Sequence, residues 1–505
     1  MASSAETNVS LWLRTSSTEP AFPKLERDID VDVAVIGAGI TGLTTAYLVK
    51  QDGRSVAVLE RDLVGTGTTG YTTAKVTALQ GLMYRFLEES YDTDTARVYA
   101  NASETGMELV ASLAKDADVR RLPSYTFTRS REDVPRIEEE VAAASRAGLA
   151  VSFEADCGLP FDVSGAVGLP DQVHFHPKRY CDALAQEVAD VSERTEAVDV
   201  DDGDPCTVET SDGRTIRAGA VVVATQLPFI FGGVFFAKAS PSRSYCIAGR
   251  MDDPPAGMYI SSDEPIRSIR PHYADDDTWL IVSGEGHKVG TDDDNEKRYV
   301  ALEDFAREHF GVDPELRWSA QDYMPADGLP YIGRAAHTAR NVYVATGFQK
   351  WGLSTGSFAA LLLSDLIGGR DNPWAEVFDS TRIDAPRAAK PFLEANLKAG
   401  KHFIADRLRA IRPRSIDDLG PGEGDLVDNG LRTVAAYRDD HGKLHQVSAT
   451  CTHMGCKVRF NPAEKSWDCP CHGSRFDVDG RVLEGPATKP LEDVSGDREK
   501  LDEAG

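Results

Sequence analysis

A strand, a glycine-rich turn and a helix follow one another near the start of the chain. Residues 31–50, VDVAVIGAGITGLTTAYLVK, form an apolar run, then three glycines spaced G-x-G-x-x-G, then a helical pattern. A second apolar run, SVAVLE, ends at Glu60, eighteen residues after the third glycine. This order of strand, turn, helix and acidic residue is typical of dinucleotide-binding folds. It predicts an α/β Rossmann-like domain that begins near residue 31.

The three glycines have different physical roles. Gly37 permits a tight turn, Gly39 lets the backbone approach a pyrophosphate, and Gly42 lets the helix pack on the strand. The helix N-terminus attracts phosphate, and Glu60 can accept hydrogen bonds from ribose hydroxyls. Between residues 100 and 300 we find no second glycine-rich strand–turn–helix pattern. The sequence therefore favours one bound dinucleotide, and if that is a flavin, it disfavours reduction of the flavin by NADH.

Three further segments resemble the D-amino-acid, glycine and sarcosine oxidase superfamily of flavoproteins. They are GTGTTGYTTAKVT (65–77), TIRAGAVVVAT (215–225), and PADGLPYIG with the run NVYVATGFQKWGLSTGSFAALLLSDLI (325–367). The resemblance covers about residues 30–370 and implies an FAD-binding domain with an α+β substrate domain. It also implies that the last helix points its N-terminus at the flavin. The expected FAD-binding residues, from motif and resemblance together, are Gly37, Gly39, Ile40, Thr41, Gly42, Glu60, Arg61, Thr68, Thr72, Thr73, Ala224, Thr225, Gly347, Gly352, Leu353 and Ser354.

The chain departs from the superfamily members that bind flavin covalently. Where a histidine would carry the flavin, the nearest residue is Tyr71, and residues 325–367 contain no cysteine. We therefore expect non-covalent FAD. Four cysteines outside the C-terminal cluster are expected to be reduced, partly buried thiols. They are Cys157, Cys181, Cys206 and Cys246.

The substrate class implied by the resemblance is a small amine or amino acid, whose C–N bond is oxidised to an imine. The segment SIRPHYADDDTWLIVSGEGHKVG (268–290) resembles the strand that carries a carboxylate-binding arginine in that superfamily. Arg270 fits that position best, with His272 beside it. Lys350 is a further candidate for the pocket. The alternative is an ordinary charged strand, with Lys350 only capping a turn.

Near the C-terminus, CTHMGCKVRFNPAEKSWDCPCHGSRF (451–476) holds four of the eight cysteines. Two short boxes each offer thiolate and imidazole groups, separated by residues 454–468. Four thiolates would suit zinc or a plant-type iron–sulfur cluster, whereas two cysteines with two histidines suit a Rieske [2Fe–2S] centre. A zinc knuckle with similar spacing is the alternative.

These boxes closely resemble the cytochrome bc-type branch of the Rieske family, over about residues 415–500. The resemblance implies that Cys451 and Cys469 bind one iron and that His453 and His472 bind the other. It also implies a disulfide between Cys456 and Cys471, which oxygenase-type Rieske domains usually lack. Ser474 matches a serine that hydrogen-bonds to a cluster sulfur. Phe476 stands where high-potential members have a tyrosine, so we expect a middling reduction potential.

Composition excludes several classes of function. The net charge of −26 and pI near 4.8 argue against nucleic-acid binding and against an anionic membrane surface. The most apolar stretch, 220–236, is interrupted by Thr, Gln, Pro and Gly and is too short to span a bilayer. The N-terminus lacks the pattern of a secretory signal. We therefore expect a cytoplasmic protein without a membrane span.

The expected organisation is a leader over 1–30, an oxidoreductase over 31–400, a linker over 401–425 and an all-β Rieske domain over 415–505. FAD segments are expected at 31–90, 150–240 and 316–395, and substrate segments at 91–149 and 241–315. The sequence predicts that FAD oxidises the amine and passes electrons through the cluster to an external acceptor. Two alternatives stay open: an electron-transfer component that supplies a partner oxygenase, and a flavin fold kept only as a scaffold.

Overall fold

The computed structural model describes residues 6–114, 116–230, 234–274, 277–291, 294–382, 414–428 and 432–495. The chain divides into two compact units. The first consists of Met1–Gly233, Ser244–Gly286 and Ala301–Ile383, and the second of Val234–Arg243, His287–Val300 and Asp384–Gly505. Two short segments from the middle of the chain thus belong to the same unit as its C-terminal part.

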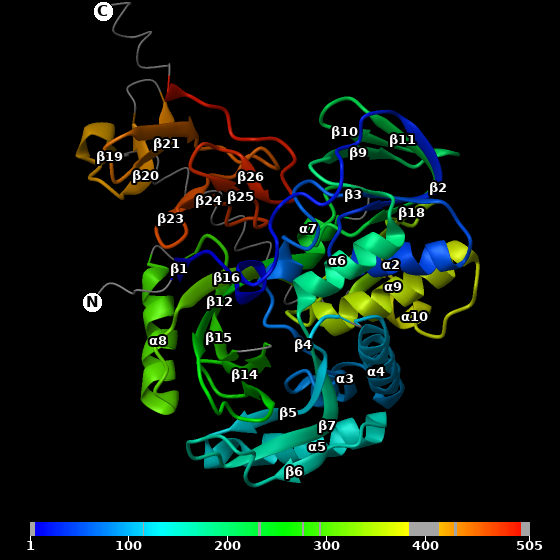
Figure 1. Ribbon diagram of the computed structural model, residues 1–505, viewed down its shortest axis with the longest axis vertical. Coiled ribbons are helices and arrows are strands. Elements are labelled where there is room, and N and C mark those ends of the chain that lie inside the picture. Colours follow the sequence, from blue (N-terminus) through cyan, green and yellow to red (C-terminus); the bar gives the residue numbers. More distant parts are fainter. Residues whose placement is uncertain are drawn as a thin grey trace, which may run out of the picture. The chain divides into compact units, whose positions relative to one another are not determined.

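An eight-stranded sheet of the first unit carries the glycine-rich motif (Figure 1). Its strands pair in the order β17 (Tyr331–Arg334), β18 (Val342–Thr346), β11 (Thr215–Val223), β2 (Ile29–Ile36), β3 (Val56–Leu59) and β8 (Val191–Ser192), with β9 (Ala197–Asp201) and β10 (Cys206–Thr210) attached to β11. Strands β18, β11, β2, β3 and β8 are parallel. Because parallel sheets are covered on both faces, their central strands are apolar throughout, as in β3, whose residues are all buried.

Small residues let the helices of this unit approach closely. Helix α2 (Ile40–Gln51) packs against α9 (Gly352–Gly368), and a Cβ on Gly356 would lie 2.3 Å from Thr41 Oγ1. Helix α4 (Thr93–Leu113) packs against α9 from another side, and a Cβ on Gly106 would lie 2.7 Å from the Ser354 carbonyl oxygen. These crossings fix the start of α9 relative to the glycine-rich turn.

A ten-stranded sheet makes up the substrate part. Its order is β1 (Glu6–Thr7), β16 (Leu316–Pro325), β12 (Ala239–Arg250), β15 (Thr278–Lys288), β14 (Arg267–Tyr273), β13 (Met258–Ser261), β5 (Arg120–Thr128), β7 (Gly165–His174) and β4 (Lys75–Val76), with β6 (Ser152–Glu154) paired to β7. Strands β7 and β16 fall inside segments expected for the FAD domain, yet they pair in this sheet. The remaining helices are α3 (Met83–Ser90), α5 (Val134–Ala147), α6 (Pro177–Val188), α7 (Phe235–Lys238), α8 (Glu296–Phe310) and α10 (Ala375–Phe378).

The N-terminal segment differs from the extended leader that the sequence suggested. Strand β1 pairs with β16, and helix α1 (Leu11–Arg14) buries Leu11 and Trp12 completely. The Ser10 hydroxyl caps α1 by accepting from the Leu13 amide at 3.2 Å. Burial of two large apolar side chains outweighs the weak helical propensity of so short a segment.

The described part of the second unit is dominated by two small sheets. One has the order β19 (Arg414–Ser415), β20 (Gly424–Asp428), β21 (Thr433–Arg438) and β22 (Leu444–Ser448), and the other β23 (Arg459–Asn461), β24 (Ser466–Asp468), β25 (Arg475–Asp477) and β26 (Val482–Glu484). Trp467 and Phe476 are fully buried between them and the cysteine loops. Residues 401–413 of the expected linker lie outside the described residues, and structure begins again at Arg414.

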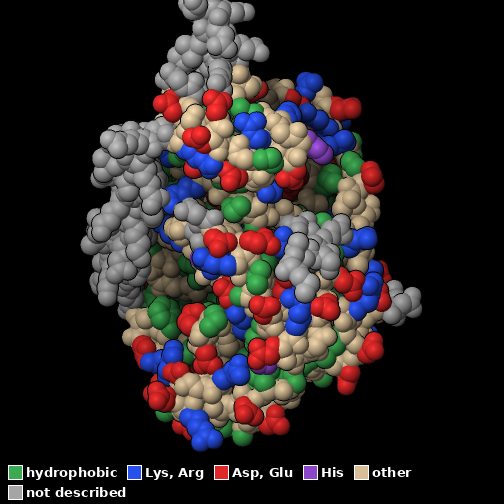
Figure 2. All heavy atoms as spheres, turned by 90° about the vertical axis from the view of Figure 1, so that its left-hand side faces the viewer, with side chains coloured by type: hydrophobic (Ala, Val, Ile, Leu, Met, Phe, Trp, Pro, Cys, Tyr) green, Lys and Arg blue, Asp and Glu red, His purple; other side chains and the backbone are tan. Residues whose placement is uncertain are grey.

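Helices of the described ranges do not reach the length and apolarity that crossing a membrane requires. On the face shown in Figure 2, acidic side chains are scattered among basic ones and do not gather in one field. This distribution fits a role of the negative charge in solubility.

Candidate functional site

The turn between β2 and α2 has the geometry that the glycine spacing predicts. Gly37 has φ +104°, and a Cβ there would lie 2.7 Å from the Ala224 carbonyl oxygen. A Cβ on Gly42 would lie only 1.9 Å from the Gly37 carbonyl oxygen. The Ile40 amide, in the first turn of α2, donates a hydrogen bond to the Thr69 hydroxyl, which lies outside the helix at 3.2 Å. The N-terminus of α2 and the 65–77 loop therefore meet where a pyrophosphate would bind.

Glu60 holds this turn from the end of β3. Its carboxylate accepts from the Ala38 amide at 2.8 Å and from the Asp62 amide at 2.9 Å. Burial raises the pKa of Glu60, although both amides oppose the shift. Arg61 points instead to a surface ion pair with Asp62, at 3.1 Å. The position of Glu60 suits a ribose.

Three buried side chains fix the loop that should lie beneath the flavin. Trp318 Nε1 donates to the Tyr71 carbonyl at 2.9 Å, and Trp12 Nε1 donates to the Thr72 carbonyl at 2.6 Å. Arg270 Nη1 donates to the carbonyls of Thr73 and Ala74 at 2.6 and 2.7 Å. Four successive carbonyls are thus bound from the protein interior, and Ala74 is held at φ +59°. The sequence did not reveal that Trp12 and Trp318 hold this loop.

Arg270, expected as a carboxylate-binding residue, makes further bonds within the protein. Its Nε donates to the Pro271 carbonyl at 2.9 Å, its Nη2 contacts His174 Nδ1 at 3.2 Å, and its side chain is fully buried. A guanidinium with its groups directed at backbone and imidazole is placed to support the loop.

His272 is likewise a packing residue. Its ring lies edge-on to Trp12 at 4.8 Å between centroids and to His176 at 5.9 Å. Burial first, and then the Arg270 charge, lower its pKa to about 2. A permanently neutral, buried imidazole is a poor general acid or base at physiological pH.

The turn before α9 is held in an unusual conformation. Gly347, Gln349 and Lys350 have φ of +77°, +52° and +69°, and two of these residues carry side chains that disfavour positive φ. Asp322 stabilises the turn by accepting from the Lys350 amide at 2.6 Å and from the Tyr323 amide at 2.7 Å. Burial raises the pKa of Asp322 to about 6. Ser354, in the first turn of α9, bonds to the Thr77 backbone at 2.9 and 3.0 Å and so ties the helix to the flavin loop.

Two lysines are candidates for the site: the side chain of Lys75 is buried, whereas that of Lys350 is exposed. Lys350 Nζ donates to Ser244 Oγ at 2.8 Å. Lys75 Nζ donates to Ser268 Oγ at 2.6 Å and to the Tyr259 carbonyl at 3.2 Å. Desolvation lowers the pKa of both lysines, that of Lys75 to about 7. Both amines act on the Cys246 thiol, whose pKa burial nevertheless raises to about 12.

Lys75 was overlooked in the sequence because it lies in a loop that the resemblance assigns to FAD. Its Nζ also lies 5.4 Å from the centre of the Trp351 ring, next to the start of α9. A buried amine of lowered pKa at this place is typical of a functional site.

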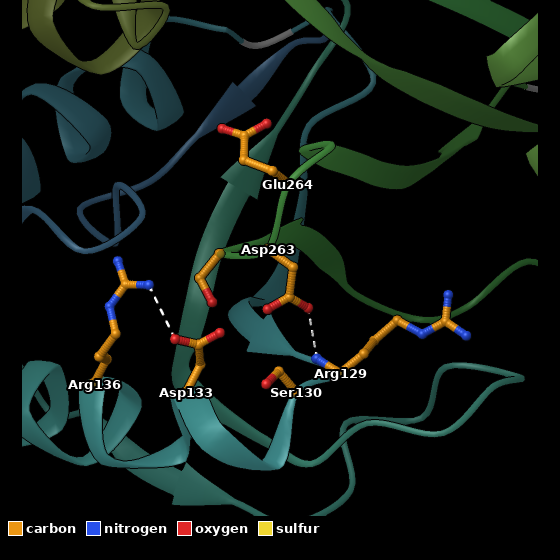
Figure 3. A pocket seen from close by; sticks show the side chains of 7 residues that line it. Arg129, Ser130, Asp133, Arg136, Asp263 and Glu264 are labelled. Atoms are coloured by element: carbon orange, nitrogen blue, oxygen red, sulfur yellow. Dashed lines mark hydrogen bonds and ion pairs between the residues drawn. The ribbon is translucent and has the colours of Figure 1, made fainter.

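Figure 3 shows a hollow at the end of the ten-stranded sheet. Asp263 accepts from the Arg129 amide at 2.6 Å, and Arg136 pairs with Asp133 at 3.2 Å. Glu264 lines one end of the hollow. These residues suggest no chemistry of their own.

Replacement of Lys75 by Met tests its buried state. Because its pKa is lowered from 10.5 to about 7, the unfolded chain binds more protons than the folded protein between these pH values. The free energy of unfolding of the natural protein should therefore gain up to about 5 kcal/mol from this residue as pH rises from 7 to 10.5. In urea unfolding, the free energy of unfolding that Lys75→Met gains over the natural protein should be larger at pH 7 than at pH 10. For the exposed Lys24→Met, this difference should be the same at both pH values. An equal difference at pH 7 and pH 10 for Lys75→Met would contradict a buried amine with a lowered pKa.

Two loops of the second unit share one backbone pattern. Gly455 N–H donates to the Cys451 carbonyl, and Gly473 N–H donates to the Cys469 carbonyl, both at 3.0 Å. The two glycines have φ of +76° and +81°, a backbone conformation that glycine adopts readily because it has no Cβ. Each loop thus turns back within five residues and directs a cysteine and a histidine to the same side.

The four proposed ligands fit a cluster with two sulfur and two imidazole donors. The neighbouring Cys469 thiol and the Ser474 hydroxyl both lower the pKa of Cys451. The rings of His453 and His472 lie 5.1 Å apart between centroids and perpendicular. Burial lowers the pKa of both imidazoles to about 4, so they are neutral, as metal ligands must be.

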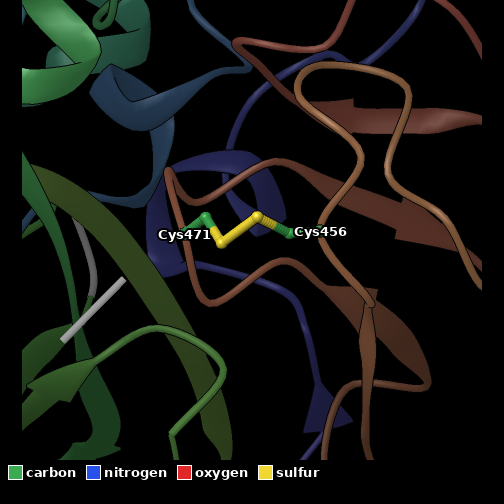
Figure 4. The surroundings of a disulfide bond; sticks show 2 residues. All are labelled: Cys456 and Cys471. Carbon is green, nitrogen blue, oxygen red and sulfur yellow. A yellow bond between two sulfur atoms is a disulfide. The ribbon is translucent and has the colours of Figure 1, made fainter. Parts of the chain in front are cut away.

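A disulfide between Cys456 and Cys471 links the loops, as predicted (Figure 4). Their Cα atoms lie 6.6 Å apart, and the two cysteines are fifteen positions apart in the sequence. The other six cysteines are free and buried. The Cys469 sulfur is within 4.8 Å of both disulfide sulfurs, so the link is next to a proposed iron ligand.

Loss of the disulfide should make the cluster labile. Cys456→Ser or Cys471→Ser removes a bond that holds both ligand loops, whereas Cys206→Ser changes a thiol of β10 in the first unit. We expect iron and acid-labile sulfide to be lost on mild heating or dilution several times faster in the first two variants only. Equal retention in all three would show that the loops do not depend on the link.

The comparisons with known proteins agree with these features. Residues 32–366 match the family described as FAD dependent oxidoreductase, and residues 413–495 match the Rieske [2Fe-2S] domain. The chain is 34% identical over 498 residues to the Rieske 2Fe-2S iron-sulfur protein YhfW of Bacillus subtilis (strain 168), over 96% of this chain and 97% of that protein.

Two solved structures share the fold of the first unit. Glycine oxidase from Geobacillus kaustophilus has a TM-score of 0.58 at 19% identity, covering 70% of this chain and 99% of its own. L-amino acid deaminase from Proteus vulgaris has a TM-score of 0.59 at 15% identity, covering 72% and 99%. At these identities the likeness concerns the fold.

A Rossmann-like nucleotide fold and a cysteine–histidine cluster site in one chain define an oxidoreductase with two cofactors. The chain belongs to the FAD-dependent oxidoreductase family and carries a C-terminal Rieske [2Fe–2S] domain. FAD and a [2Fe–2S] cluster are its cofactors, which confirms both cofactors expected from the sequence.

Proposed function

We propose that the protein oxidises a small amine or amino acid with FAD and passes the electrons through its Rieske cluster to an external acceptor. The observation that carries the proposal is the presence of both redox domains in one chain. A bound flavin would take two electrons from a C–N bond, and a bound cluster would carry one electron at a time. The resulting imine is hydrolysed by water.

The amine pair supports an anionic substrate group. Lys75 comes from the flavin loop and bonds to Ser268, Lys350 comes from the turn before α9 and bonds to Ser244, and both charges act on the Cys246 thiol. With Arg270 engaged by the loop carbonyls, these lysines take its expected place as partners of a substrate carboxylate. In a buried site such a charge-assisted bond is strong enough to orient the substrate.

In the second unit, we propose Cys451 and Cys469 as ligands of one iron and His453 and His472 as ligands of the other. The paired thiols, the paired imidazoles and the adjacent disulfide support this assignment. Ser474, which lowers the pKa of Cys451, would tune the cluster.

Anaerobic mixing with a panel of amines and amino acids tests the proposal. We expect at least one of them to bleach the flavin absorbance, followed by the paramagnetic signal of a reduced Rieske cluster. Reduction by NADH instead, with no response to the panel, would favour an electron-transfer component. Lys75→Met should raise the concentration of substrate needed for half-maximal bleaching more than exposed Lys24→Met does.

Acid precipitation tests the mode of FAD binding. Because Tyr71 stands where a flavin-linking histidine would be, we expect all of the flavin in the supernatant as intact FAD. Yellow colour that stays with the precipitated polypeptide would show a covalent bond.

A further inference from the structure

The Rieske domain contains a buried group of charges. Arg475 contacts three carboxylates: Nε lies 2.9 Å from Asp468, Nη1 lies 2.9 Å from Glu484, and Nη2 bonds to Glu464. The side chains of Asp468 and Glu464 are 5% exposed, and that of Glu484 is 26% exposed. Three buried negative charges around one guanidinium require a further cation.

Arg243 supplies that cation from a distant part of the sequence. Its Nη1 lies 3.1 Å from Glu464 and its Nη2 lies 3.0 Å from Glu484, with 1% of its side chain exposed. Arg243 is in the first half of β12, within the segment that matches the oxidoreductase family, yet it belongs to the same compact unit as the Rieske domain. The Tyr299 hydroxyl, from the second short segment of this unit, donates to Glu464 at 3.2 Å.

The same segment covers the proposed histidine ligands. Phe236, in α7, places its ring 5.2 Å from that of His472 and 5.8 Å from that of His453, edge-on to both. Because α7 continues directly into β12, the ring contact and the Arg243 ion pairs belong to one continuous stretch of eight residues.

The second segment contacts the other side of the ligand loop. A Cβ on Gly290 would lie 2.8 Å from the Pro470 nitrogen and 2.9 Å from its Cα, and Gly290 has φ +65°. Pro470 stands between the two cysteines of the second box. Backbone contact this close leaves room only for glycine.

We propose that Val234–Arg243 and His287–Val300 form a clamp on the Rieske domain, within the same compact unit, that covers the imidazole edge of its cluster. Arg243 is the positioning residue and Phe236 is the cover. Loss of Arg243 would remove one of the two guanidiniums that pair with Glu464 and Glu484, which strongly disfavours opening of the clamp. The ring of Phe236 then limits the access of water to the imidazole edge. This inference rests on the proposed ligation by His453 and His472.

Hydrogen exchange measured by mass spectrometry tests the clamp without reference to turnover. In Arg243→Leu, the amides of 236–243 and 461–468 should exchange about a hundredfold faster, because a buried charge pair is broken. Arg250→Leu is the matched control: it lies in the same strand, its side chain is 53% exposed, and it pairs with Asp277 and Glu315. Unchanged exchange in Arg243→Leu would overturn the clamp.

Water access to the reduced cluster is a second test, which also serves if Arg243→Leu does not fold. After transfer to D2O, Phe236→Ala should show deeper deuterium modulation of the cluster's spin echo than the natural protein, whereas Phe153→Ala, at an exposed site, should not. Equal modulation in Phe236→Ala and the natural protein would overturn the cover. A natural protein without any Rieske signal would refute the ligation, while the exchange experiment would still decide on the clamp.

Discussion

The His472→Ala protein should keep its FAD, and substrate should still reduce that FAD. It should lose the Rieske signal and the delivery of electrons to a one-electron acceptor. Removing one imidazole leaves an open position on the iron, and ligand loss at such sites is rarely compensated. We expect acceptor reduction to fall by about a hundredfold or more. Flavin absorbance, iron content and the signal of the reduced protein are measured on the same sample.

His441→Ala is the control for this variant. His441 lies in the exposed turn between β21 and β22 of the same domain, so its loss should change none of these quantities. If His472→Ala lacks the cluster and still reduces the natural acceptor at the original rate, then the Rieske domain is a structural appendage.

Gly42→Ala should abolish FAD binding. The added methyl group would lie 1.9 Å from the Gly37 carbonyl oxygen and 3.3 Å from Val35 Cγ1, so α2 must move away from the turn. We expect less than about a tenth of the normal flavin content and a loss of about 2 kcal/mol or more in stability.

Gly485→Ala is the control for this change. It lies in the Rieske domain, and its added Cβ would have no atom within 4 Å. Its flavin content should equal that of the natural protein. A normal flavin-to-protein ratio in Gly42→Ala would show that the turn does not hold the nucleotide as described.

The features that could be predicted from the sequence are those that a few neighbouring residues determine. The β2–α2 turn needs Gly37 and Gly42 because backbone atoms approach there, and such needs leave a fixed spacing. The Cys456–Cys471 disulfide was predicted and is present for a similar reason, since both ligand loops have a recognisable order of residues. The assignment of the four iron ligands stays a prediction.

The features that could not be predicted join residues far apart in the chain. Trp12 reaches the Thr72 carbonyl across sixty residues, and Arg270 reaches Thr73 across almost two hundred. A sequence pattern can place Arg270 in a strand, but it does not show that the guanidinium will donate to backbone carbonyls of a distant loop. Arg243 is the clearest example, because the carboxylates that it pairs with lie more than two hundred residues later.

Electron transfer from flavin to cluster within one molecule is the central claim, and flash photoreduction of the flavin tests it most directly. With the cluster oxidised beforehand and oxygen excluded, the absorbance of the reduced flavin should decay as the reduced-cluster signal grows. Both changes should have one rate constant, independent of protein concentration. A rate that increases in proportion to protein concentration, or a reduced flavin that persists beside an oxidised cluster, would contradict the account.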